Sequence, residues 1–200
     1  MSQSLRHFPF PITTPRLLLR KPCIEDSAAV NAGVEESFNE LNQFMPWARQ
    51  RQTLAETKLF IEQAITNWIV QKSEEPWFPI FMFDRTSQEF IGTTGYHHIE
   101  WESMCLQIGY WIRTSKSGQG FMTEAVNALT RYAFEELGMR RVAITCDIKN
   151  IRSQKVAERL GFTHEATLEQ NRVTVDGQMS DTLVFARYSP AGLPTLEVRW

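Results

Sequence analysis

The architecture follows most directly from residues 104–125, which read MCLQIGYWIRTSKSGQGFMTEA. Residues 104–112 form an apolar run that is typical of a buried strand. Gly118 and Gly120 then interrupt the pattern, and apolar residues recur at helical spacing from Met122 to Leu137. A strand, a glycine-containing loop and the start of a helix therefore follow one another.

A second strand is predicted after this helix, at residues 141–146, where β-branched and apolar residues dominate. Because a helix connects the two strands, we expect them to be parallel, with a right-handed crossover. The remaining pattern predicts a helix at 151–160 and two strands, at 163–170 and 182–188.

The residues before the central segment predict the other half of a sheet. Thr53 and Glu56 have the spacing of a capping box, which predicts a helix running to about residue 72. Residues 38–52 are rich in aromatic and amide side chains and are assigned no element. The other predicted elements are a strand at 16–20, a helix at 24–37, and strands at 77–83 and 89–99, of which the last forms a hairpin with 104–112.

Together these elements predict one domain of the α+β class. Its α/β mixed sheet has about seven strands, is mostly antiparallel and is flanked by helices. We expect this domain to span residues 13–188, with an N-terminal segment at 1–12 and a peripheral C-terminal tail at 189–200.

Composition argues against several classes of protein. The formal net charge is −2, so no basic field draws the chain to nucleic acid. No apolar run approaches the ~20 residues that span a bilayer, and the polar start lacks the apolar stretch of a secretory signal. Three cysteines without a CxxC pair predict reduced thiols and a cytoplasmic protein. His97 and His98 are adjacent on a strand, so we expect them on opposite faces, and no metal site is predicted.

The loop between strand and helix has the features of a phosphate site. Gly118 and Gly120 allow close backbone approach, and the free amides up to Thr123 lie at a helix N-terminus. Lys116 adds a positive charge nearby. A plain turn is the alternative interpretation, because glycine pairs before helices are common. Neither the GxxxxGK nor the GxGxxG spacing is present.

A second polar group follows the strand at 141–146. Asn150 and Ser153 both lie at the predicted start of the next helix, where their side chains can act as hydrogen-bond partners. The alternative is that Asn150 is the N-cap and Ser153 a surface residue. The two interpretations are compatible, because a capped helix start also orients polar groups.

Several blocks of this chain resemble the GNAT acetyltransferase superfamily, and its RimJ/RimL-type branch in particular. The similarity runs from about residue 13 to residue 187, and ordered blocks at family-like spacing are more specific than any single block. The blocks are TPRLLLR (14–20), FIG (90–92), IGYWI (108–112), GQGFMTEA (118–125), NIRS (150–153) and VAERLGF (156–162).

The resemblance implies an acetyl-CoA site in a V-shaped gap between the predicted fourth and fifth strands. The pyrophosphate would contact the loop amides, the pantetheine arm would pair with one strand, and Asn150 would bond to that arm. Ser153 matches a position proposed to protonate the leaving thiolate. The implied cofactor-binding residues are Tyr110, Trp111, Ile112, Gly118, Gln119, Gly120, Phe121, Met122, Thr123, Asn150 and Ser153.

Three positions depart from the family pattern. Ser117 replaces the usual basic residue before the first glycine, and we expect Lys116 to substitute for it. Gln107 stands where the family often has glutamate and cannot act as a base. Glu169 is the carboxylate nearest to the region where the RimL type places a catalytic glutamate. It is therefore the candidate base, and the alternatives are that Glu169 is a solvated strand residue and that the base acts through water.

The resulting functional prediction is transfer of the acetyl group of acetyl-CoA to a primary amine, such as a (ribosomal) protein N-terminal α-amine. A small-molecule amine is an alternative acceptor, and a non-catalytic acyl-CoA-binding sensor is an alternative class. Phe44 and Trp47 are candidates for binding the acceptor, or else for covering the core. The resemblance and an aromatic content of 12% predict weak self-association or a homodimer.

Overall fold

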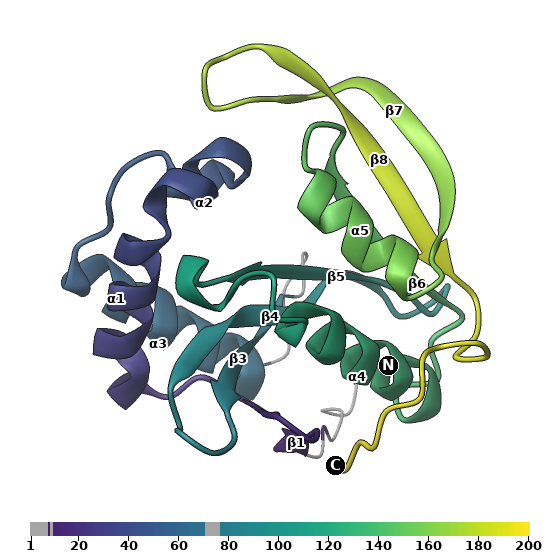
Figure 1. Ribbon diagram of the computed structural model, residues 1–200, viewed down its shortest axis with the longest axis horizontal. Helices are drawn as coiled ribbons and strands as arrows, with labels where there is room; N and C mark the ends of the chain where they lie inside the picture. The colour runs from purple at the N-terminus through teal and green to yellow at the C-terminus, as the bar shows by residue number, and fades with distance from the viewer. Residues whose placement is uncertain (1–7, 9, 71–76) are drawn as a thin grey trace.

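The computed structural model describes residues 8, 10–70 and 77–200, and its centre is one mixed sheet of eight strands. The spatial order is β1-β2-β3-β4-β5-β6-β8-β7 (Figure 1). β5 and β6 are parallel, and the other described pairs are antiparallel. The strands are β1 (Ile12–Thr13), β2 (Leu17–Arg20), β3 (Phe78–Asp84), β4 (Phe90–Glu100), β5 (Cys105–Ile112), β6 (Arg141–Asp147), β7 (Thr163–Val173) and β8 (Met179–Arg187).

The predicted class is confirmed, and the sheet has one strand more than the sequence pattern indicated. The additional strand is β1, which has two residues and pairs with Leu18 and Leu19 of β2. It is too short to leave a period-two pattern, and Pro11 and Pro15 flank it. β7 and β8 are also longer than predicted, because their pairing extends toward the turn at Asp176 and Gly177.

Helices cover both faces of the sheet, and β3 shows this most clearly. Ile80 and Met82 belong to a core cluster with α4 (Phe121–Glu135), whereas Phe81 and Phe83 belong to a second cluster. The second cluster also contains residues of α1 (Ser27–Glu36) and α3 (Leu54–Val70). Because side chains alternate along a strand, the two clusters lie on opposite faces. We call these faces the α4 face and the α1 face.

Local sequence signals fix most of the helix ends. The Thr53 hydroxyl accepts from the Glu56 N–H (3.2 Å) while the Glu56 carboxylate accepts from the Thr53 N–H (2.7 Å), so the predicted capping box is confirmed. The end predicted for this helix, beyond Val70, lies outside the described residues. Residues 38–52, to which no element was assigned, contain α2 (Phe38–Phe44) and a 3₁₀ turn at Pro46–Ala48.

The parallel strands β5 and β6 separate along their length. They pair only over Cys105–Gln107 and Arg141–Ala143, and the rest of β6 pairs with β8 alone among the described strands. Residues 108–112 of β5 therefore border an opening in the sheet, which agrees with the predicted gap between the fourth and fifth strands. α5 (Ile151–Arg159) follows β6 and lies beside this opening (Figure 1).

The C-terminal tail is less peripheral than expected. Leu193 is buried against the α4-face core, and the Asn127 amide of α4 donates to the Pro194 carbonyl (2.9 Å). Thr13 and Arg199 exchange two backbone hydrogen bonds, of 2.7 and 2.9 Å. Trp200 packs edge-on against Tyr132 of α4. The tail thus covers the outside of α4 and joins the β1 edge of the sheet.

Candidate active site

The loop before α4 has the backbone geometry of an anion site. Gly118 and Gly120 have φ values of +76° and +82°, in the left-handed region that favours glycine. A Cβ atom at Gly118 would meet nothing within 4 Å, so the loop surface is open there. The first N–H groups of α4 have no acceptor within the helix and are available to a ligand. Phe121 and Met122 bury their side chains in the core, so they offer the ligand only their backbone.

The positive charge beside this loop differs from the expected one. Lys116 does not extend freely, because its Nζ contacts the Glu89 carboxylate (2.5 Å). Arg16, just before β2, also lies beside the loop: its guanidinium donates to the Gln119 carbonyl (2.9 Å) and pairs with Glu124 (2.6 Å). One of its nitrogens would lie 3.4 Å from a Cβ atom at Gly120. Periodicity and spacing did not indicate that Arg16 lies beside this loop.

The second polar group joins α5 to β5 across the opening. Asn150 caps α5, because its Oδ1 accepts from the Ser153 N–H (3.1 Å). The Ser153 hydroxyl lies 2.8 Å from the Tyr110 hydroxyl, and both are largely buried. Burial also raises the pKa of Tyr110, which keeps the phenol protonated at physiological pH. The structure thus places Asn150 and Ser153 together, as the sequence predicted, and adds a contact with the Tyr110 hydroxyl that the sequence did not indicate.

Aromatic side chains mark the α1 face next to the opening. The ring of Trp111, on β5, lies 6.2 Å from that of Trp47 and 5.8 Å from that of Phe90. Trp47 is 43% exposed, so it is a surface residue rather than part of the core. The Asn42 amide donates to the Ala48 carbonyl (2.9 Å), which holds the 3₁₀ turn that carries Trp47. Phe44 is half-buried at the end of α2.

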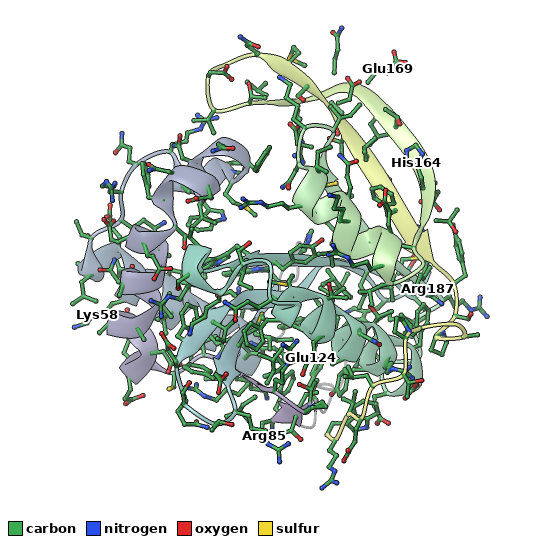
Figure 2. The ribbon with its side chains drawn as sticks, in the orientation of Figure 1. Lys58, Arg85, Glu124, His164, Glu169 and Arg187 are labelled. Atoms are coloured by element: carbon green, nitrogen blue, oxygen red, sulfur yellow. The ribbon has the colours of Figure 1, made fainter. Side chains whose placement is uncertain are left out.

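Glu169 is not brought to this site. It is exposed on β7, at the end of the sheet order, and Figure 2 shows its side chain on the outer side of the β7–β8 hairpin. Ser153, the other predicted catalytic residue, is buried at the start of α5. The position of Glu169 therefore gives no support to the role of base.

The expectation that His97 and His98 lie on opposite faces is wrong. Their ring centroids are 4.9 Å apart, in an edge-on arrangement. A bulge in β4 explains the contact: the register shifts between His97 and Glu100, and His98 has a φ of +47°. No cluster of three or more potential metal ligands occurs among the described residues.

Comparisons with known proteins agree with this geometry. A family model described as an acetyltransferase (GNAT) domain matches residues 16–163. The ribosomal-protein-serine acetyltransferase of Escherichia coli (strain K12) is 30% identical over 147 residues, which cover 74% of this chain and 78% of that protein.

Two solved structures extend the likeness to the fold. RimL, a ribosomal L7/L12 alpha-N-protein acetyltransferase in complex with coenzyme A, has a TM-score of 0.80 at 25% identity, covering 89% of this chain and 97% of that one. The microcin C7 self-immunity acetyltransferase MccE, in complex with acetyl-CoA and AMP, has a TM-score of 0.79 at 21% identity, covering 88% and 93%. The second likeness shows the fold alone.

This chain belongs to the GNAT acetyltransferases. It is an acyl-CoA-dependent N-acetyltransferase of the RimL-like branch, and acetyl-CoA carries, as a thioester, the acetyl group that is transferred to an amine. The chain's own residues fit that co-substrate. The loop at Gly118 is open, the first amides of α4 are available, and residues 108–112 of β5 border the opening in the sheet.

Proposed function

We propose that this enzyme acetylates the α-amine of a protein N-terminus, and that its acceptor is a ribosomal protein. Support comes from the relatives, one named a ribosomal-protein-serine acetyltransferase and another a ribosomal L7/L12 alpha-N-protein acetyltransferase. The geometric support is the Trp47–Trp111 pair beside the opening, on the face opposite α4. Exposed aromatic rings bind a peptide backbone and small side chains without requiring a second charge.

We assign the following roles to the residues around the opening. The amides from Gly118 to Thr123 hold the pyrophosphate, and the backbone of residues 110–112 pairs with the pantetheine arm. Asn150 has its Oδ1 engaged in the α5 cap, which leaves its amide nitrogen to donate to that arm. The Ser153 hydroxyl supplies the proton that the departing sulfur requires.

The acceptor class is tested with a panel of amines and labelled acetyl-CoA. The panel contains a short peptide with a free N-terminal serine, the same peptide with a blocked N-terminus and an internal lysine, and a polyamine. We expect CoA thiol release and label incorporation with the free N-terminus and little with the other two. Faster turnover of the polyamine would identify a small-molecule acetyltransferase. Tight CoA binding without turnover of any amine would indicate a non-catalytic binding module.

Trp47 provides a direct test of the acceptor side. We expect Trp47→Ala to raise the KM for the peptide about 10-fold, because the variant loses a ring contact of about 1 kcal/mol or more. Acetyl-CoA affinity, measured by calorimetry, should stay within about two-fold, since the ring lies on the α1 face. Trp200→Ala is the matched control, because Trp200 is also partly exposed but packs against Tyr132 of α4. A parallel loss of both affinities and of melting temperature in Trp47→Ala would show that the ring stabilises the fold and does not bind the acceptor.

Two further properties remain proposals. We propose that the protein is cytoplasmic, which its three unpaired cysteines favour. We also propose weak self-association or a homodimer, and sedimentation velocity at high concentration measures it directly. None of the described helices is both long and apolar enough to cross a membrane.

A further inference from the structure

The structure leaves the proton of the acceptor amine without an assigned base. Gln107 cannot accept it as a base, and Glu169 is on the outer strand. The register of β4 and β5 shows which titratable side chain of the α1 face lies where β5 and β6 separate. Tyr96 pairs with Ile108 on the α4 face, so the neighbouring residues His97 and Gly109 lie on the α1 face.

His97 extends over the backbone of Gly109. A Cβ atom at Gly109 would lie 3.0 Å from the Nε2 atom of His97, so the imidazole occupies space that a side chain would otherwise take. Gly109 is also the residue before Tyr110, and β5 no longer pairs with β6 at this point. The ring is therefore beside the opening, on the face opposite the Tyr110–Ser153 pair.

The ring is also in a state that can accept a proton. His97 is mostly buried, and neither ring nitrogen hydrogen-bonds to another residue in the described part of the chain. Burial, with a further contribution from His98, lowers the pKa of His97 from its usual 6.5 to about 4. The imidazole is thus neutral at physiological pH and has a lone pair available.

We propose that His97 is the catalytic base, which takes the proton from the acceptor nitrogen on the α1 face while Ser153 acts from the α4 face. This inference rests on the proposed function, because it assumes that the acceptor approaches beside Trp47 and Trp111. It assigns the two proton transfers to two sides of one sheet. The proton then leaves His97 to solvent, since the ring is only partly buried.

The lone pair of a neutral amine forms the bond to the acetyl carbon, and the carbon–sulfur bond breaks with its electron pair on sulfur. The nitrogen proton passes to His97 and then to solvent, while sulfur takes a proton from the Ser153 hydroxyl, which regains one from solvent. One amine and one thioester thus give one amide and one thiol.

A base of this strength also selects among amines. It is too weak to deprotonate an alkylammonium ion, but the nitrogen becomes strongly acidic once it is bonded to the acetyl carbon. The amine must therefore arrive neutral. An N-terminal α-amine has a pKa of about 7.7–8.0 and a lysine amine about 10.4, so the neutral fraction at pH 7.5 favours the α-amine by a factor of several hundred. The requirement for a neutral amine thereby favours protein N-termini over lysine side chains.

Chemical rescue tests the proposal. In His97→Gly we expect kcat to fall about 100-fold or more, as for loss of a general base. CoA affinity by calorimetry should stay within about two-fold, which also shows that the variant is folded. Added imidazole should raise the kcat of His97→Gly by at least about 10-fold, because the deleted ring leaves a space beside Gly109. The increase should saturate with imidazole concentration. His97→Gln should be as slow as His97→Gly without imidazole, and His164→Gln, at an exposed histidine of β7, should retain full activity.

Several results would overturn the assignment. It fails if His97→Gln retains wild-type kcat, which would show that the ring only packs against its neighbours. It also fails if imidazole does not raise the kcat of a folded His97→Gly. It fails equally if CoA affinity falls in parallel with kcat. The wild-type enzyme is measured first on the amine panel, and the variants are then measured on whichever amine it acetylates. The amine panel therefore shows first whether the proposed acceptor is wrong. The variants then show separately whether the role of His97 is wrong.

Discussion

Replacing Gly120 with valine is expected to weaken acetyl-CoA binding by about 100-fold or more. Gly120 has a φ of +82° and immediately precedes α4, whose first amides face the proposed pyrophosphate site. A β-branched residue in this conformation is strained, and relief of the strain would rotate the amides away from the ligand. The added side chain would also extend toward Arg16 and cover the loop.

A matched control separates strain from binding. Gly177, in the turn between β7 and β8, has a φ of +80°, and a Cβ atom there meets nothing within 4 Å. Gly177→Val should therefore suffer a similar loss of stability, but its CoA affinity by calorimetry should equal that of the wild type. Unchanged CoA affinity in Gly120→Val would show that the loop is not part of the cofactor site.

Replacing Ser153 with alanine is expected to lower kcat about 100-fold, the range for loss of a general acid. CoA affinity should change by no more than about three-fold, because proton donation to sulfur occurs late in the reaction. The Ser153 N–H remains bonded to Asn150, so the cap of α5 persists in the variant. Steady-state kinetics with a good acceptor, beside a thermal melt, provide the measurement.

Tyr110→Phe is the informative comparison for this variant. It removes the 2.8 Å contact with the Ser153 hydroxyl but leaves that hydroxyl in place. We expect a smaller loss of kcat, of about 10-fold or less, since the proton donor remains. A Ser153→Ala enzyme with wild-type kcat would contradict the acid role. A larger loss in Tyr110→Phe than in Ser153→Ala would transfer that role to the phenol.

The elements that sequence predicted well are those defined by local chemistry. The run from β5 through α4 to β6 has a clear change of period, and Thr53 with Glu56 marks the start of α3 by two reciprocal bonds. Asn150 and Ser153 are predicted to act at one helix start because they follow a buried strand and begin a short helix. In each case the deciding contacts lie within a few residues of one another.

The features that were missed depend on contacts between distant segments. Arg16 reaches the loop only because β2 lies next to α4, and Glu124 fixes it there from 108 residues away. Lys116 is held by Glu89, which no spacing rule indicates. The bulge at His98 turns two adjacent rings toward each other, whereas regular alternation predicts the opposite. Glu169 was chosen by position in the chain, and pairing with β8 places it on the outer strand.

In the arrangement proposed above, coenzyme A and the acceptor approach the separation of β5 from β6 from opposite faces of the sheet. A single inhibitor that joined coenzyme A to an acceptor peptide would have to thread the gap beyond Gln107 and Ala143, with its linker beside Gly109. The width of the linker at that point would be limited by the backbones of β5 and β6, which cannot move apart without loss of their hydrogen bonds to β4 and β8. An unbranched linker would fit between the strands. A bulky linker would be excluded, however tightly the two ends of the inhibitor bind.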